Sequence, residues 1–137
     1  MKKVTTTAIC FVLVLYMFAQ AKKPVSQPSA KRGKQVFETT CITCHQKDGG
    51  GVPHLNPPLI KTQYVLGDKA RLIQIVLKGL NQPIEIEDDT YSNPMPAQSQ
   101  LSDQQIADVL TYVRNSFGNK ASAVTVAQVK AERAKTK

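Results

Sequence analysis

Cys41-Ile42-Thr43-Cys44-His45 is the stretch that decides how this sequence is interpreted. Its two cysteines lie three positions apart and a histidine follows at once, so within one helical turn both sulfurs and the imidazole come to one side. Two thiols can form thioether bonds to the vinyl groups of one haem while the adjacent histidine binds its iron. The pentapeptide therefore predicts one covalently bound haem c, attached through Cys41 and Cys44 and ligated by His45.

Three other kinds of site use paired cysteines. A structural zinc site needs four protein ligands, and after residue 21 the sequence offers only the three in this motif and His54, beyond a glycine-rich stretch. A thioredoxin-like redox pair needs a strand before its first cysteine and an α/β pattern around it, and neither is visible. A plain disulfide would leave His45 unexplained. The haem interpretation accounts for all three residues.

The first 21 residues are typical of an export signal. Lys2-Lys3 precedes the apolar run Ala8–Phe18, and Ala19-Gln20-Ala21 matches a small-x-small cleavage site. The run is shorter than the about 20 apolar residues of a membrane-spanning helix, which favours cleavage before Lys22 over retention as an anchor. Cys10 would leave with this signal peptide. Export predicts a periplasmic protein, and covalent haem attachment is typical of that location.

The remaining 116 residues are enough for one small domain. We expect a linker over residues 22–30, a haem domain over 31–119 and a basic C-terminal tail over 120–137. Nine basic residues balance nine acidic ones in residues 31–117, so the excess positive charge lies at the two ends. This distribution argues against nucleic-acid binding, which needs a basic face, and allows at most weak contact with a membrane surface.

Four helices are predicted from capping residues and from apolar residues at three- and four-residue spacing. They span residues 30–40, 69–80, 103–117 and 126–134, with Ser29, Asp68, Ser102 and Thr125 as their N-caps. Gly33 in the first helix predicts close contact with another helix. Alternating residues over 83–92 predict a small hairpin that turns at Asp88-Asp89.

Two proline-rich segments are predicted to complete the site. The Pro57 carbonyl is free to accept a hydrogen bond from the His45 nitrogen that does not bind iron. Met95, the one methionine after the signal peptide, lies between two prolines and outside any apolar helix face. A thioether so placed is suited to the sixth position of the iron. The rival ligand, His54, follows His45 by only nine residues on a loop that would have to wrap around the ring.

In this order, the features of residues 31–119 resemble a class I cytochrome c of the small bacterial monohaem type. The resemblance rests on the Cys-x-x-Cys-His motif, Pro57-Pro58-Leu59, Pro94-Met95-Pro96 and the amphipathic helix before Gly118. It implies a mainly α fold, with about four helices around one covalently bound haem and a small β-hairpin before the methionine ligand. Where many members of the family carry a glycine after Pro-Pro-Leu, this sequence has Ile60-Lys61.

The resemblance also implies specific contacts and a setting. Gly33 and Phe37 resemble the residues of the first helix that meet the last one, and Val109 and Tyr112 resemble their counterparts. The hairpin and the C-terminal tail are similar to those of cytochrome c domains associated with periplasmic quinoprotein dehydrogenases.

His45 and Met95 together would leave no open position on the iron, which favours transfer of one electron over binding of oxygen or peroxide. We therefore expect a monomeric one-electron carrier, not an enzyme, between redox protein partners such as a periplasmic dehydrogenase and a terminal oxidase or respiratory complex. Two alternatives stay open: an accessory subunit of a dehydrogenase or oxidase, held through the residues after Ala121, and a haem enzyme or ligand sensor with a labile Met95. A two-haem peroxidase would need a second Cys-x-x-Cys-His motif, which this sequence lacks.

Overall fold

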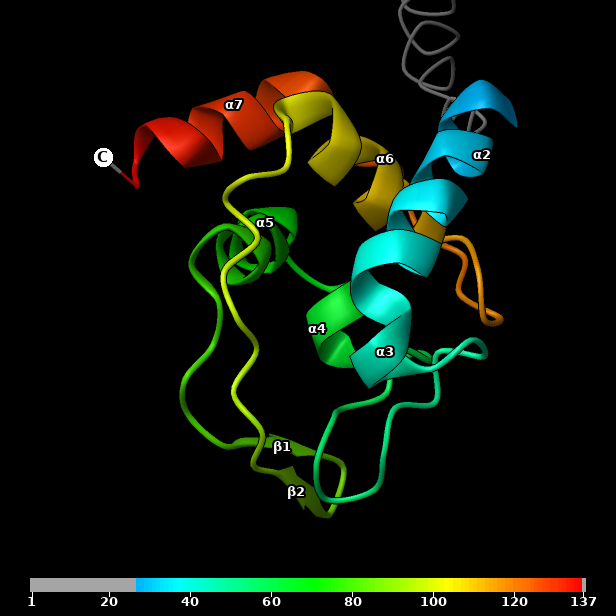
Figure 1. Ribbon diagram of the computed structural model, residues 1–137, viewed down its shortest axis with the longest axis vertical. Coiled ribbons are helices and arrows are strands. Elements are labelled where there is room, and N and C mark those ends of the chain that lie inside the picture. Colours follow the sequence, from blue (N-terminus) through cyan, green and yellow to red (C-terminus); the bar gives the residue numbers. More distant parts are fainter. Residues whose placement is uncertain (1–26, 137) are drawn as a thin grey trace, which may run out of the picture.

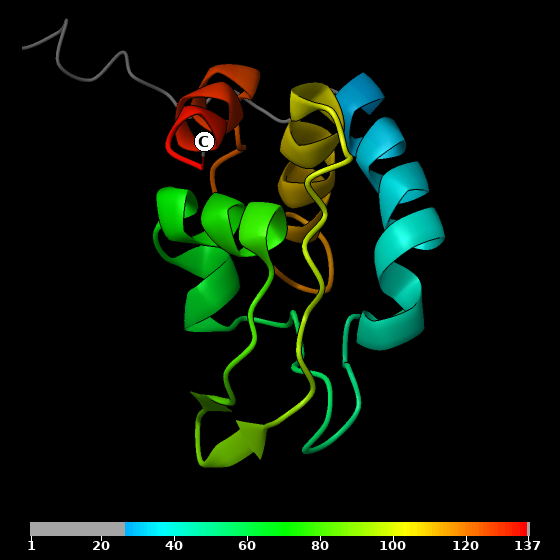
Figure 2. The same cartoon turned by 60° about the vertical axis from the view of Figure 1, so that its left-hand side comes forward.

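The computed structural model describes residues 27–136, so the predicted signal peptide and most of the linker lie outside the described residues. The elements, in chain order, are α2 (Gln27–Val36), a π-helical turn η1 (Phe37–Cys41), α3 (Ile42–His45), α4 (Gln63–Leu66), α5 (Lys69–Lys78), β1 (Ile84–Ile86), β2 (Asp89–Tyr91), α6 (Asp103–Val113) and α7 (Val126–Ala134). The predicted mainly α fold with one hairpin is confirmed. Figures 1 and 2 show α7 at one end of the molecule and the hairpin at the other. Long loops join the hairpin to α5 and to α6. Within residues 27–136, no helix is long and apolar enough to cross a bilayer.

The first helix starts earlier than predicted. Ser29 lies inside α2 and does not cap it, because its hydroxyl donates to Asp108 Oδ1 at 2.5 Å. At its other end, α2 widens into the π-helical turn η1, where hydrogen bonds span one residue more than in an α-helix. The Thr39 hydroxyl donates to the carbonyls of Gln35 and Val36, at 3.0 and 3.2 Å, which supports this wider turn.

Helices α2 and α6 pack in direct contact, side by side in Figure 2. A Cβ placed on Gly33 would lie 2.1 Å from the Asp108 carbonyl oxygen and 2.7 Å from the Tyr112 Cβ, so no side chain fits there. One turn further on, the Phe37 ring lies 5.6 Å from that of Tyr112 and 5.4 Å from that of Phe117. The close helix contact predicted for Gly33 is confirmed.

An ion pair between the half-exposed Arg32 and a buried carboxylate joins the same two helices. Arg32 Nε donates to Asp108 Oδ2 at 2.6 Å and Arg32 Nη2 to Oδ1 at 3.1 Å, and the Asp108 side chain is 3% exposed. Burial alone would raise the pKa of Asp108, but the hydrogen bonds from Arg32 and Ser29 bring it below its ordinary value. Asp108 is therefore a carboxylate at neutral pH.

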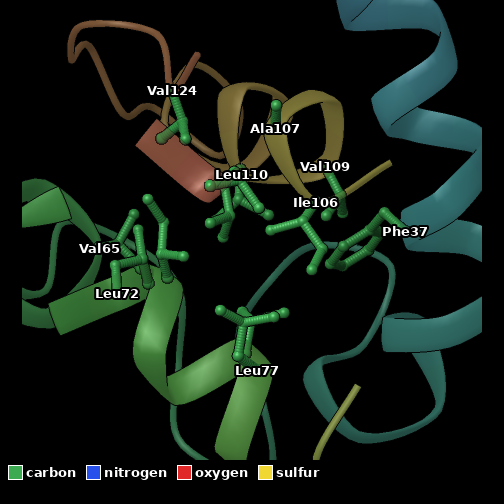
Figure 3. Close-up of a cluster of buried hydrophobic side chains, with 13 residues drawn as sticks. Phe37, Val65, Leu72, Leu77, Ile106, Ala107, Val109, Leu110 and Val124 are labelled. Atoms are coloured by element: carbon green, nitrogen blue, oxygen red, sulfur yellow. The ribbon is translucent and has the colours of Figure 1, made fainter. Parts of the chain in front are cut away.

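The hydrophobic core lies between α6 and its neighbours. Figure 3 shows Phe37 against Ile106 and Val109 on one side of this cluster, and Val65 and Leu72 on the other. The Ser102 capping box predicted at the start of α6 is present, but the helix ends at Val113, four residues before its predicted end. Phe117 and Gly118 then take positive φ angles of 56° and 78°, which turn the chain back toward the core.

The end of α5 and the turn of the hairpin differ from their predicted positions because of backbone pairing between segments. Asp68 caps α5 as predicted, accepting from the Arg71 N–H at 2.7 Å, but the helix ends at Lys78. The reason is that Leu80 pairs with Met95 through two backbone hydrogen bonds of 2.9 and 2.8 Å. The hairpin pairs Ile84 with Tyr91 and Ile86 with Asp89, so its turn is Glu87-Asp88, one residue before the predicted one.

The C-terminal segment is part of the domain, not a free tail. Thr125 caps α7 with a full capping box, and Val129 is fully buried while Val126 stays 38% exposed. Arg133 Nε donates to Asp103 Oδ1 of α6 at 2.6 Å, and the Gln74 amide of α5 donates to the Glu132 carbonyl at 2.8 Å. Helix α7 is therefore docked on α5 and α6.

Replacing Gly33 with alanine should destabilise the protein. The substitution gains about 1 kcal/mol of helix propensity, but overpacking against a backbone carbonyl costs about 1–3 kcal/mol. We expect a net loss of up to about 2 kcal/mol in the free energy of unfolding, measured by denaturant titration. Lys34→Ala, on the exposed side of the same helix, is the control and should stay within about 0.5 kcal/mol of wild type. Equal stability of both variants would contradict the close contact.

Replacing Asp108 with asparagine should change how stability depends on pH. Because the pKa of Asp108 is lower in the folded protein, its contribution is present above the unfolded value near about 4 and is lost as pH falls through the folded value. At pH 7 the free energy of unfolding of the variant, measured by denaturant titration, should be about 1.5–3 kcal/mol below that of wild type. This difference in free energy should become smaller in more acidic solution. A difference that stays constant on acidification would count against a charged Asp108.

Candidate functional site

A cleft lined by mostly apolar side chains lies between the helices and the two proline-rich loops. Three potential ligand side chains line it: Cys41, His45 and Met95. Its apolar lining comes from several elements and includes Pro57, Pro58, Leu59, Val65, Leu72, Ile75, Val76, Leu80, Ile84, Ile86, Leu101, Val109, Leu110 and Val113. The structure thus brings the predicted histidine and methionine to one apolar space.

His45 is held by the contact predicted from the sequence. Its Nδ1 lies 3.0 Å from the Pro57 carbonyl oxygen. Because a carbonyl can only accept, Nδ1 carries the proton and the lone pair of the neutral ring is on Nε2. Burial lowers the pKa of His45, and the hydrogen bond to Pro57 opposes this shift in part. The ring is therefore neutral, the form that binds a metal.

A glycine-rich loop places the Pro57 carbonyl. Gly51 N–H donates to the His45 carbonyl at 3.1 Å, and Leu59 N–H donates to the Gly49 carbonyl at 2.7 Å. A Cβ on Gly51, whose φ is +68°, would come within 2.7 Å of the Pro57 oxygen. The absence of a side chain at Gly51 lets the loop close around the His45 contact.

Asn119 fixes the same segment from the other side, and sequence reasoning missed it. This residue is 3% exposed, and its Nδ2 donates to the carbonyls of Leu59 and Val113, both at 2.8 Å. Its Oδ1 accepts from the Lys61 N–H at 2.7 Å. Lys61 has a φ of +52°, the conformation that a glycine would adopt most easily. The Asn119 side chain therefore holds the loop path although glycine is missing here.

Arg114, which directly follows α6, was also missed. It is 3% exposed, and its guanidinium donates to the carbonyls of Ser122 at 2.9 Å and Gly67 at 3.3 Å, and to that of Val65. Burial lowers its pKa. These bonds join α4, which forms part of the cleft wall, to the segment before α7. Only a tertiary structure could reveal partners that lie so far away in sequence.

Met95 reaches the cleft from the loop that follows the hairpin. It is half-buried, and its backbone N–H and C=O both bond to Leu80. A Cβ on Gly79 would lie 2.4 Å from the Met95 carbonyl oxygen, so the chain passes close to the end of α5. The Met95 backbone is therefore held at both its N–H and its C=O group.

The two cysteines are free thiols rather than a disulfide. Cys41 is half-buried in the cleft. Burial of its thiol, and to a smaller extent the nearby charge of Cys44, raise the pKa of Cys41 to about 11. Cys44 is exposed. In the part of the chain that the structure describes, no three His, Cys, Asp or Glu side chains lie where they could hold one metal ion.

The rival ligand His54 does not line the cleft. Its side chain is 72% exposed, and its Nδ1 lies 3.9 Å from Asp89 Oδ1 of the hairpin. One thiol, one neutral imidazole and one thioether line the apolar cleft, while the Cys44 thiol is exposed and does not line it. This donor set fits a covalently held haem.

Comparisons with known proteins agree with this geometry. The sequence model of the family described as "Cytochrome c" matches residues 30–117. The cytochrome c subunit of the alcohol dehydrogenase (quinone) of Gluconacetobacter polyoxogenes is 36% identical over 100 residues, covering 71% of this chain and 21% of that subunit. Cytochrome c-552 of Thermus thermophilus is 35% identical over 83 residues, covering 58% of this chain and 63% of that protein.

A third relative is the cytochrome c subunit of the gluconate 2-dehydrogenase of Pantoea cypripedii, 34% identical over 102 residues, which are 72% of this chain and 23% of that subunit. The chain thus spans about a fifth of the length of the two dehydrogenase subunits and under two thirds of cytochrome c-552.

Replacing Asn119 with alanine should loosen the loop that supports His45. Three hydrogen bonds are lost and buried backbone groups remain unpaired, so the free energy of unfolding should fall by about 2–4 kcal/mol. Asn115→Ala is the matched control, since that side chain makes one bond, to the Thr111 carbonyl at 2.9 Å, and should cost at most about 1 kcal/mol. Equal losses in denaturant titrations would show that Asn119 has no such role.

Proposed function

The chain belongs to the cytochrome c family, and from this premise we propose that it is a one-electron carrier with His45 and Met95 as the axial ligands of its haem. The observation that carries the proposal is the meeting of two fixed groups in one apolar cleft: an imidazole held by the Pro57 carbonyl, and a thioether whose backbone pairs with Leu80. In this proposal Cys41 and Cys44 hold the haem covalently.

The haem, when bound, supplies one-electron chemistry because its iron is stable in both the ferric and the ferrous state. The chain's own residues decide what else can happen. Pro57 fixes the orientation of the His45 ring, and Met95 fills the position where an external ligand would otherwise bind. The apolar lining keeps water away and favours the less charged, reduced state. This combination supports electron transfer rather than catalysis.

We propose redox proteins as partners, a dehydrogenase as donor and a terminal oxidase or respiratory complex as acceptor. Support comes from relatives named as cytochrome subunits of dehydrogenases and of an oxidase. We further propose export to the periplasm, on the sequence pattern of the first 21 residues.

A monomeric carrier is favoured over a subunit held through its C-terminal tail. Arg133 pairs with Asp103 and Lys135 with Glu132, both at 2.6 Å, so two of the basic residues of this segment are used within the chain. The relatives' names keep the accessory subunit as the second candidate. Co-purification of a dehydrogenase or oxidase with the tagged protein would favour the subunit.

Replacing Met95 with alanine should lower the midpoint potential of the haem, because loss of the thioether removes a ligand that favours ferrous iron. We expect a fall on the order of 0.1 V, a fraction of the roughly 0.8 V that axial ligation spans. Leu101→Ala is the control: it removes an apolar side chain from the same cleft without removing a ligand atom, so its midpoint should fall much less than that of Met95→Ala. Redox titrations that give both variants the wild-type midpoint would refute Met95 as ligand.

A further inference from the structure

The loop that carries Pro57 and the loop that carries Met95 are joined directly to each other. Ser92 N–H and its hydroxyl both donate to the His54 carbonyl, at 3.3 and 3.2 Å, and Asn93 N–H donates to the Leu55 carbonyl at 3.0 Å. The side chains add a fourth bond, from Asn93 Nδ2 to Asn56 Oδ1 at 3.2 Å. We call these four hydrogen bonds the loop tie.

The loop tie lies next to both supports of the proposed iron site. Asn56 directly precedes Pro57, whose carbonyl holds His45, and Asn93 lies two residues before Met95. Each asparagine is followed by a proline, which fixes its own φ and restricts the residue before it to extended conformations. A displacement at either asparagine is therefore passed on along the chain instead of being absorbed by a bond rotation.

One side of the tie is rigidly placed and the other is not. Two backbone hydrogen bonds join Asn56 to Val52. The Asn56 N–H donates to the Val52 carbonyl at 2.9 Å, and the Val52 N–H donates to the Asn56 carbonyl at 2.8 Å. Asn93, by contrast, is exposed, and its backbone and side-chain bonds within residues 27–136 all go to the Pro57 loop. Between Tyr91 of β2 and Met95, which pairs with Leu80, the chain is thus held by its bonds to the Pro57 loop.

From this geometry we propose that Asn56 and Asn93 are positioning residues whose side-chain bond sets how readily Met95 leaves the iron. The inference rests on the proposed function, in which His45 and Met95 are the axial ligands. The tie restrains the residues just before Met95, so a backbone movement that carries the thioether out of the cleft strains or breaks the tie. The tie therefore slows replacement of Met95 by an external ligand.

The test measures how fast imidazole replaces Met95 in the oxidised, haem-loaded protein, followed by the change in haem absorption. Loss of one such hydrogen bond should speed replacement roughly two- to tenfold in Asn56→Ala and in Asn93→Ala. The double variant should be no faster than either single one, because both substitutions remove the same bond. Asn115→Ala, which removes an asparagine bond outside the tie, should keep the wild-type rate.

Two isosteric variants separate positioning from a general loss of structure. Asn56→Asp keeps the acceptor for the Asn93 amide and should exchange at or below the wild-type rate. Asn93→Leu removes the donor at similar side-chain volume and offers no acceptor to a rotated Asn56 amide, so it should exchange as fast as Asn93→Ala. Thermal unfolding of both variants near that of wild type would show that the difference arises locally.

The concentration dependence and the spectrum before imidazole is added distinguish failure of this inference from failure of the proposed function. A wild-type rate that levels off at high imidazole means that release of an internal ligand is limiting. If this plateau is seen and the alanine variants exchange at the wild-type rate, the loop tie alone is overturned. The same holds if the effects of the two single substitutions add in the double variant. An absorption spectrum of a five-coordinate or water-ligated haem before imidazole is added would mean an open position on the iron, and both proposals would fall together.

Discussion

The hydrogen bond between His45 Nδ1 and the Pro57 carbonyl is the contact on which the site depends. It fixes the tautomer of the imidazole, because a carbonyl cannot donate, and it leaves Nε2 to bind iron. Much of the surrounding chain serves to hold that carbonyl in place. The loop around Gly51 closes on it from one side, and Asn119 holds the following segment from the other.

Helix α6 transmits this constraint to the rest of the fold. Its buried face meets Gly33 and Phe37, so it positions the helical segment that ends in the Cys-x-x-Cys-His motif. The residues just beyond α6, Arg114 and Asn119, bind the cleft wall and the Pro57 segment. Helix α6 thus positions both the attachment motif and the segment that supports its histidine. This explains how residues far apart in sequence keep a defined geometry. The contacts of Met95 with Leu80 bring the remaining proposed ligand to the same cleft.

Local patterns predicted what depends on neighbouring residues. The caps at Asp68, Ser102 and Thr125 and the contact of His45 with Pro57 all follow from a few adjacent side chains, and all are present. The close contact of Gly33 with a second helix was also predicted, but other features that depend on distant partners were wrong or missed. Ser29 cannot be recognised as a partner of Asp108 without the α2–α6 contact, and the buried roles of Arg114 and Asn119 depend on carbonyls more than 40 residues away. The bounds and cap of α7 were predicted, but not the helices on which it docks, because its one fully buried apolar residue, Val129, gives a weak sequence signal.

The most direct test of the account is the absorption spectrum of the reduced, haem-loaded protein, recorded before and after addition of carbon monoxide. With His45 and Met95 both bound to the iron, the spectrum should show the bands of a six-coordinate c-type haem and should stay unchanged. A rapid shift to the spectrum of a carbon monoxide complex would mean an open or labile position on the iron. That result would contradict the carrier and favour a ligand sensor or a haem enzyme.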